Sequence, residues 1–244
     1  MNPDSNTVIS LSNVHFSVPQ MHILKGITAE IRKSDSLFLT GKSGSGKSCL
    51  LKIIACLQNP TTGDVITKGI SLRSATQAQL MELHINDGFV FQDNALISNL
   101  TVYDNLALQM RYQKTHSENE IREKIQSSLD NLGLRHIMNS RTASLSLGEQ
   151  KLLSITRAVQ NKPDLVFFDE PLASLDTQSA QKVTDIIKGL AENGVTLVII
   201  SHEPEFILQF ASRLWVIESG NLSKDIPIPK NMHMSALREL SGTF

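Results

Sequence analysis

The sequence predicts an α/β fold that is organised around a parallel β-sheet. Two unbroken apolar runs, Leu165–Phe168 and Val195–Ile200, have the composition of parallel strands that are covered on both faces. A third apolar run, Leu37–Thr40, leads directly into a glycine-rich loop, after which Cys49–Leu57 has helical character. A loop that follows a strand in this way lies at the carboxyl end of the sheet, where open α/β folds bind their ligands.

The glycine-rich loop, Gly41–Ser48, is the most specific pattern in the chain. It reads GKSGSGKS and fits the spacing G-x-x-x-x-G-K-[ST] of a phosphate-binding loop, or P-loop. Without Cβ atoms at its glycines, the backbone can turn tightly and aim its N–H groups at an anion, and the next helix adds its positive N-terminal end. Average residue usage gives such a match by chance in about one chain in a hundred of this length.

A nucleotide is therefore the expected ligand of this loop. Lys47 is expected to lie across the β- and γ-phosphates, and the Ser48 hydroxyl is expected to hold Mg²⁺. The residues expected to bind the nucleotide here are Gly41, Lys42, Ser43, Gly44, Ser45, Gly46, Lys47, Ser48 and Cys49.

Length and charge bound the class of protein. A chain of 244 residues suits one large domain or a domain with an inserted lobe. The net charge of −1 provides no field that draws the chain to nucleic acid or anionic lipid. Its apolar runs are too short to span a bilayer, so we expect any membrane connection to come through a partner. The polar start Met1–Thr7 is unlike a signal peptide, and Cys49 and Cys56 are expected on one helix face as reduced core thiols.

The remaining pattern divides the chain into strands and helices. Before the loop, Val8–Phe16 and Ile23–Ile31 alternate around a turn at Pro19-Gln20, as paired antiparallel strands do. The other expected strands are Val65–Lys68, Gly88–Phe91 and Leu214–Glu218. Helical periodicity marks Val102–Tyr112, Ser117–Leu132, Glu149–Val159 and Thr177–Glu192. The first three of these helices lie within residues 93–159, which therefore read as an inserted helical lobe.

Further polar residues stand where predicted strands end. The run Leu165–Phe168 is followed by Asp169 and Glu170, and acids at the end of a buried strand are costly unless they face a cleft or a metal. Asp169 fits a carboxylate that holds Mg²⁺ through water, and Glu170 fits the group that polarises the attacking water. His202 and Gln92 also follow strands, although either residue alone is more often structural.

Together these positions resemble the ATP-binding subunit of ABC transporters, over residues 7–220. In chain order the matching motifs are Gly41–Ser48 (Walker A), Gln92 (Q-loop), Leu145–Glu149 (signature), Asp169-Glu170 (Walker B), Ser174–Asp176 (D-loop) and His202 (switch). Ordered motifs at these separations are highly specific.

The resemblance implies a P-loop NTPase fold with a RecA-like core, an antiparallel β-subdomain and an inserted α-helical subdomain. Residues 1–92 and 160–220 would form the core with its β-subdomain, residues 93–159 the helical subdomain, and residues 221–244 a tail without a firm assignment. It also implies ATP hydrolysis with Mg²⁺, in a head-to-tail homodimer that holds two ATP molecules.

The resemblance assigns roles to individual residues. The catalytic residues would be Lys47, Gln92, Glu170 and His202, and the Mg²⁺ ligands would be Ser48, Gln92 and Asp169. Ser146 and Gly148 of the signature would approach the γ-phosphate that is bound to the other subunit. Ser146 and Glu149 also form a capping-box pattern, and a capped helix N-terminus is itself an anion site, so both interpretations hold together.

The sequence departs from the family pattern at two places. The usual signature LSGGQ is LSLGE here, with Leu147 and Glu149 substituted. Where the family often has a tyrosine that stacks on adenine, this chain has Val18, and strand alternation leaves open which face of its strand Phe16 occupies. Base stacking is therefore an open question.

The segment Phe91–Asn105 resembles the Q-loop neighbourhood of Mla-type ATPases, which serve MCE-domain phospholipid transporters. The feature that favours this subgroup is Ala95-Leu96, shortly after Gln92. It implies a transmembrane permease and an MCE-domain protein as partners, at the cytoplasmic face of the bacterial inner membrane. Lipoprotein-release and cell-division ABC ATPases share most of the pattern and are the alternative.

The sequence fits two other classes of function less well. A soluble ABC ATPase that acts on ribosomes or DNA fits less well, because such proteins have two cassettes or a long coiled coil, and no nucleic-acid partner is expected. A binding-only subunit with a decayed site would explain Leu147 and Val18, but the chain retains Lys47, Asp169 and Glu170.

Overall fold

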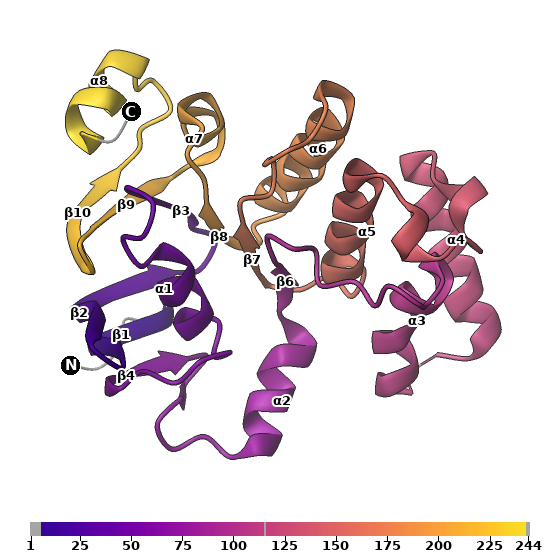
Figure 1. Cartoon of the computed structure of the whole chain (residues 1–244), viewed down its shortest axis with the longest axis horizontal. Helices are drawn as coiled ribbons and strands as arrows, with labels where there is room; N and C mark the ends of the chain where they lie inside the picture. The colour runs from indigo at the N-terminus through magenta and orange to yellow at the C-terminus, as the bar shows by residue number, and fades with distance from the viewer. Residues whose placement is uncertain (1–5, 115, 243–244) are drawn as a thin grey trace.

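The computed structural model describes residues 6–114 and 116–242. Residues 1–5 of the predicted core and residues 243–244 of the predicted tail lie outside the described residues. Its strands form two sheets (Figure 1). The larger sheet has the order β10-β9-β3-β8-β7-β6, and the smaller has the order β2-β1-β4-β5. The α/β fold that the sequence predicts is confirmed.

The larger sheet is parallel across β6, β7, β8, β3 and β9. Its strands are β3 (Ser36–Thr40), β6 (Gly88–Val90), β7 (Leu165–Asp169), β8 (Thr196–Ile200), β9 (Arg213–Glu218) and β10 (Asn221–Pro227). Every residue of β3, β7 and β8 is buried, which is why these strands read as unbroken apolar runs. The carboxyl ends of β3, β7 and β8 therefore meet at one edge of the sheet.

The smaller sheet is antiparallel. It contains β1 (Thr7–Val18), β2 (Met21–Arg32), β4 (Thr62–Thr67) and β5 (Ile70–Ser71). The hairpin between β1 and β2 turns at Pro19-Gln20, as predicted, and Gln20 has the positive φ of 69° that this tight turn requires. Both strands extend beyond the predicted ranges by a few residues.

Three helices form the lobe that lies to one side of the larger sheet (Figure 1). They are α3 (Val102–Gln113), α4 (Glu118–Leu132) and α5 (Leu147–Val159). The other helices are α1 (Lys47–Ile54), α2 (Gln77–Asn86), α6 (Thr177–Glu192), α7 (Pro204–Phe210) and α8 (Met234–Ser241), with short 3-10 turns at Arg135–Ile137 and Thr142–Ser144. No described helix combines the length and the apolar content needed to cross a membrane.

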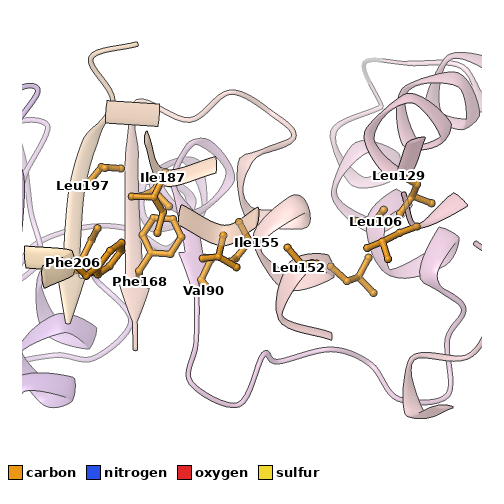
Figure 2. Packing of buried hydrophobic residues seen from close by; sticks show 14 of the residues in the cluster. Val90, Leu106, Leu129, Leu152, Ile155, Phe168, Ile187, Leu197 and Phe206 are labelled. Atoms are coloured by element: carbon orange, nitrogen blue, oxygen red, sulfur yellow. The ribbon is translucent and has the colours of Figure 1, made fainter. Parts of the chain in front are cut away.

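Helix α5 joins the lobe to the sheet. Figure 2 shows a continuous row of buried side chains that runs from Phe168 of β7 and Ile155 of α5 to Leu106 of α3 and Leu129 of α4. Ile155 and Leu152 lie on the same helix and are both buried in this row. Because α5 packs against the sheet and also against α3 and α4, a displacement of the lobe would move this helix relative to the sheet.

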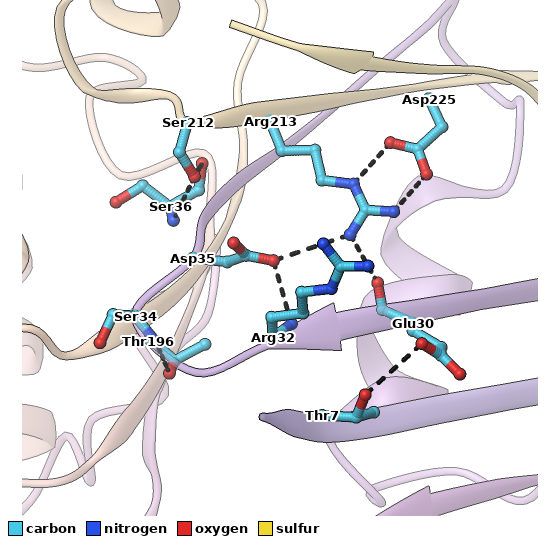
Figure 3. A network of polar contacts seen from close by, with 10 residues as sticks. All are labelled: Thr7, Glu30, Arg32, Ser34, Asp35, Ser36, Thr196, Ser212, Arg213 and Asp225. Atoms are coloured by element: carbon cyan, nitrogen blue, oxygen red, sulfur yellow. Dashed lines mark hydrogen bonds and ion pairs between the residues drawn. The ribbon is translucent and has the colours of Figure 1, made fainter. Parts of the chain in front are cut away.

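Arg213 ties the two sheets together near the end of β2 (Figure 3). Its guanidinium pairs with Asp225 of β10 and with Asp35, which follows β2, and it donates to the carbonyl oxygen of Glu30 in β2 at 2.8 Å. Arg213 Nε lies 2.6 Å from Asp225 Oδ1. The residue thus fixes the antiparallel sheet against the edge of the larger sheet.

Some predictions about elements were wrong. Helix α1 ends at Ile54, and Cys56 lies beyond it in a left-handed conformation with φ 57°, so Cys49 and Cys56 do not share a helix face. Cys56 is buried, Cys49 is partly exposed, and both are free thiols. The segment 221–242, which had no firm assignment, contains β10 and α8, and α2 and α7 were not predicted.

Candidate functional site

The loop Gly41–Ser48 closes around the carboxyl end of β3. Two of its glycines are required by close approach of the backbone: a Cβ at Gly41 would lie 2.1 Å from the carbonyl oxygen of Ile217, and one at Gly46 would lie 2.9 Å from Leu24. Both have positive φ, 140° and 104°. The loop is therefore pressed between β9 and β2.

Helix α1 begins directly at the end of the loop with its first turn unsatisfied. Its N-cap, Gly46, offers no side chain, and no acidic residue lies in the first turn. The N–H groups of Lys47, Ser48 and Cys49 consequently have no carbonyl partner within the helix, so they are available to an anion. In contrast, α4 and α5 begin with a capping box.

Lys47 is folded back onto the loop. Its side chain is buried, and Nζ donates to the carbonyl oxygens of Gly41 and Lys42 at 2.8 and 3.1 Å. Burial lowers the pKa of Lys47, and the carboxylates of Glu170 and Asp169 act against that shift. The loop thus holds a cation that these two carboxylates face.

Asp169 ends β7 in a buried position with one oxygen unsatisfied. Oδ1 has no hydrogen-bond partner among the described residues. Burial raises the pKa of Asp169, whereas the Ser48 hydroxyl and nearby lysines act in the opposite direction. A buried carboxylate oxygen without a donor, beside a serine hydroxyl, is the oxygen-rich donor set that Mg²⁺ prefers. The residues present therefore fit the metal that the family uses.

Glu170 and His202 follow neighbouring parallel strands and meet at their ends. His202 Nε2 lies 3.4 Å from Glu170 Oε1, and both side chains are partly exposed. Glu170 has a φ of 52°, and its N–H donates to the carbonyl oxygen of Ile200 at 3.1 Å. A non-glycine residue in this strained region is held there by its surroundings, and such residues cluster at functional sites.

Gln92 lies in the turn that follows β6, and β7 and β8 lie between β6 and the strand that leads into the P-loop. Its side chain is exposed. The next residues, Asn94 and Ala95, have φ values of 63° and 46°, so the chain makes two successive left-handed steps there. The carboxyl ends of β3, β7, β8 and β6 thus carry the Walker A loop, Asp169-Glu170, His202 and Gln92 along one edge of the sheet.

Two basic residues of α5 reach this edge and were not predicted from the sequence. Lys151 is buried and donates to the carbonyl oxygens of Phe91 and Gln92, and Arg157 donates to those of Ala95 and Asn94. A signal for Lys151 was present, because it precedes Ile155 by one helical turn and so lies on the buried face of an amphipathic helix.

The signature residues lie at the N-terminal end of α5, shortly before Lys151. Ser146 is its N-cap: Glu149 N donates to Ser146 Oγ at 3.3 Å, and Ser146 Oγ donates to the Glu149 carboxylate at 2.7 Å. Gly148 is buried, with its Cβ position 2.4 Å from Ser179 Oγ of α6. Within the described part of the chain, the side-chain hydrogen bonds of Ser146 are all with Glu149, so one copy does not join Ser146 to its own P-loop.

The hairpin tip near the loop carries aliphatic rather than aromatic surface. Val18 and Met21 are 41% and 62% exposed and face each other across the turn. Phe16 packs against the buried cluster beneath the antiparallel sheet. Phe16 is thus partly buried against this cluster, and the exposed side chains at the tip are aliphatic.

Comparisons with known proteins agree with this geometry. A family model described as ABC transporter matches residues 24–173. The chain is 30% identical over 217 residues to the methionine import ATP-binding protein MetN of Helicobacter pylori, which is 88% of this chain and 66% of that protein's length. It is 35% identical over 201 residues to an uncharacterized ABC transporter ATP-binding protein of Methanocaldococcus jannaschii, covering 82% of this chain and 88% of that protein.

A solved structure has the same fold. It is the dimer of an ATP-binding cassette in a post-hydrolysis state with bound ADP and Pi, with a TM-score of 0.84 and 28% identity, covering 91% of this chain and 99% of that one. The match to the family model includes the P-loop, Gln92, the signature and Asp169-Glu170, and His202 lies beyond it. The chain therefore belongs to the ABC transporter family, as an ATPase that uses ATP and Mg²⁺.

Proposed function

We propose that this ATPase powers a membrane permease, and that the transported molecule is a lipid. ATP hydrolysis is supported by the position of four residues at one sheet edge: Lys47, Asp169, Glu170 and His202. The first N–H groups of α1 at that edge have no partner within the helix. The observation that supports the permease is an apolar groove beside the Gln92 turn. The lipid assignment rests on the resemblance of the segment after Gln92 to Mla-type ATPases.

Each catalytic residue has a role that its position supports. The N–H groups of the loop and of α1, together with Lys47, bind and neutralise the phosphates. Glu170 orients the attacking water in line with the γ-phosphate, and His202, whose Nε2 contacts Glu170, holds the same phosphate. Positioning and electrostatic stabilisation supply most of the rate in such phosphoryl transfers.

Ser48, Asp169 and Gln92 are proposed to hold Mg²⁺. When bound, the ion supplies positive charge to the phosphate oxygens as charge develops on the leaving group. The unsatisfied Asp169 Oδ1 beside the Ser48 hydroxyl supports the first two ligands. Gln92 is exposed at the same sheet edge, within the turn after β6, and completes the set.

A groove of about 930 Å³ lies between α2, α3 and the C-terminal end of α5. Its walls are mainly apolar and include Met81, Leu108 and Tyr112, which are 44%, 40% and 56% exposed. Exposed apolar side chains that gather in a groove indicate a protein partner. Phe91 and Arg157 also line it, so a permease segment seated there would touch the residues that flank and hold the Gln92 turn.

A head-to-tail homodimer is proposed because the resemblance implies that Ser146 and Gly148 approach the γ-phosphate bound to the other subunit. Ser146 is exposed at the N-terminus of α5, and within the described residues its side chain bonds only to Glu149. The dimeric cassette with ADP and Pi, which is similar to this chain, supports such an arrangement. Each site would then draw on both subunits.

The proposed location is the cytoplasmic face of the bacterial inner membrane, attached through the permease, with an MCE-domain protein as a further partner. The proposed division of the chain keeps residues 1–92 and 160–220 as core and 93–159 as the helical subdomain. A lipoprotein-release or cell-division system is the alternative, since it shares most of the pattern around Gln92.

Affinity capture from native membranes tests the permease and its class. The tagged wild-type protein should recover a multi-spanning permease together with an MCE-domain protein. Leu108→Glu, in the groove, should lose both while retaining ATPase activity. Leu240→Glu is the matched control, because Leu240 is 44% exposed on α8, far from the groove residues in sequence and element.

The other outcomes decide between the alternatives. Recovery of a lipoprotein-release or cell-division permease would move the chain to that system. Capture of a permease that is unaffected by Leu108→Glu would remove the groove from the docking role. Absence of any multi-spanning protein in all captures would contradict the permease proposal itself.

A further inference from the structure

Lys151 is a buried cation that the proposed mechanism does not use. It lies in the second turn of α5 and is 3% exposed. Its Nζ donates to two successive carbonyl oxygens, those of Phe91 and Gln92, both at 3.2 Å. A buried lysine is costly unless its charge is compensated, so its presence among the buried residues of α5 calls for a reason.

The carbonyl oxygens that Lys151 binds belong to the point where β6 ends and the Gln92 turn begins. Six residues further along α5, Arg157 donates to the carbonyl oxygen of Ala95 at 2.9 Å and to that of Asn94 at 3.4 Å. Lys151 and Arg157 therefore bind backbone carbonyl oxygens of the turn on both sides of Asp93. Asn94 and Ala95 are the residues of this turn with left-handed backbone, and the hydrogen bonds from Arg157 stabilise that conformation.

The ammonium group also lies within the field of the catalytic carboxylates. Burial lowers the pKa of Lys151, and the charges of Asp169, Asp93 and Glu170 act against that shift. Lys151 in turn lowers the pKa of Asp169. The same side chain thus contacts the Gln92 backbone and stands near Asp169 on the adjacent strand, since β6 pairs with β7.

We propose that Lys151 is a positioning residue for Gln92: it fixes the Gln92 backbone at the edge of the nucleotide site and makes the turn move with α5. The inference rests on the proposed role of Gln92. Because α5 packs against both the sheet and the lobe, a shift of the lobe reaches Gln92 through this lysine. Arg157, which lines the groove, connects the same turn to the docking surface.

The test compares ATP hydrolysis by two variants of Lys151. Lys151→Met removes both hydrogen bonds of Nζ, and Lys151→Gln keeps an amide donor without the charge. For Lys151→Met, kcat should fall about tenfold, within the range of coupling found for neighbouring residues, while KM for ATP changes less than about twofold. Lys151→Gln should lie between wild type and Lys151→Met. If Lys151→Met fails to fold, Lys151→Gln alone decides, with a measurable loss expected.

Lys182→Met is the matched control. Lys182 also donates its Nζ to a backbone carbonyl oxygen, that of Leu132 at 2.8 Å, but it contacts a helix end rather than the turn. Both methionine variants should lower Tm, Lys151→Met by the larger amount, because it leaves two carbonyl oxygens without their donor and Lys182→Met leaves one. Only Lys151→Met should lower kcat.

A double-mutant cycle with Gln92→Ala shows whether Lys151 acts through Gln92. In the Gln92→Ala background, Lys151→Met should reduce kcat by less than about twofold, because the side chain that it positions is already gone. An equal reduction in both backgrounds, or a normal kcat in Lys151→Met, would overturn the inference. Lys47→Ala distinguishes a failure of the proposed function from a failure of this inference. If Lys47→Ala still hydrolyses ATP, the proposed catalytic site is wrong. If Lys47→Ala is inactive and Lys151→Met has a normal kcat, only the role of Lys151 is rejected.

Discussion

Glu170 and His202 face each other across the ends of two paired parallel strands, with Nε2 of the histidine 3.4 Å from Oε1 of the glutamate. The backbone supports this contact, because the N–H of Glu170 donates to the carbonyl oxygen of Ile200, close to His202 in sequence. The left-handed φ of Glu170 turns the chain sharply after β7. The pair is thereby held at the rim of the site, where an attacking water would approach the phosphate.

Glu170→Gln should bind ATP and hydrolyse it at least about a hundredfold more slowly, since an amide cannot take up the proton from water. Glutamine has the same shape and keeps the backbone contact, so the fold should be unaffected. A closed dimer should accumulate with Mg·ATP, as measured by size-exclusion chromatography beside phosphate release. Normal turnover by this variant would remove Glu170 from the base role.

The features that could be predicted are those with a strong local pattern. β3, β7 and β8 are buried on both faces and so are apolar throughout, and the P-loop needs its glycines at fixed spacing because the backbone approaches Ile217 and Leu24. The Ser146 capping box formed as expected. Burial and close approach are tertiary causes, but each feature leaves its mark within a short segment, as an apolar run, a glycine spacing or the Ser146–Glu149 pair, which is why a sequence pattern finds them.

The features that were missed depend on tertiary contacts or have little pattern. Helix α2 buries only Leu83, so its hydrophobic periodicity is weak, and α7 is only seven residues long. The end of α1 was misplaced because Cys56 adopts a left-handed conformation that its residue type does not favour. The helical spacing places Lys151 on the buried face of α5, but its contact with the distant Gln92 turn leaves no local pattern.

The ion pair between Lys68 and Asp87 predicts a pH-dependent loss of stability. Nζ of Lys68 lies 2.6 Å from Oδ1 of Asp87, whose side chain is 3% exposed. Lys68→Met leaves a buried carboxylate without its partner and should cost about 2 kcal/mol at pH 7, less than a fully buried pair would, because Lys68 is 28% exposed. Chemical denaturation of both proteins measures the difference.

The sign of the pH dependence follows from the pKa of Asp87. Burial raises it even in the presence of Lys68, so the folded state holds a proton more readily than the unfolded state does. Without Lys68 this pKa rises further, and protonation removes the buried charge. The stability gap between Lys68→Met and wild type should therefore narrow as the pH falls from about 7 to 5. A gap of the same size at both pH values, or one that remains in an Asp87→Asn background, would contradict this account.

Val18 predicts weak discrimination between bases. The exposed hairpin tip offers Val18 and Met21, and the partly buried Phe16 packs against the hydrophobic cluster beneath the antiparallel sheet. GTP should compete with ATP within about tenfold, or roughly 1.4 kcal/mol. Val18→Tyr should increase the preference for ATP in the same competition assay. Strict ATP preference in the wild-type protein would mean that another group supplies the stack.

The exposed signature serine predicts a site that is completed in trans. Ser146→Arg should be inactive as a homodimer, because a bulky cation at the N-terminus of α5 obstructs the γ-phosphate held by the partner. Lys47→Ala should be inactive because its own loop loses the phosphate charge partner. In a mixed dimer both lesions fall in one site, and the other site keeps an intact Lys47 and an intact Ser146. Mixing the two inactive proteins, with time for exchange, should therefore restore part of the phosphate release.

Two controls make this complementation decisive. Ser117→Arg removes an equivalent capping box, that of α4, so it costs similar helix stability, about 1 kcal/mol, yet it should leave ATPase activity unchanged. A covalently linked dimer with both lesions in one protomer leaves one lesion in each site, and it should stay inactive. Activity in that linked dimer, together with no recovery on mixing, would show that each site is built within one chain. The LSLGE segment would then act only as the start of α5.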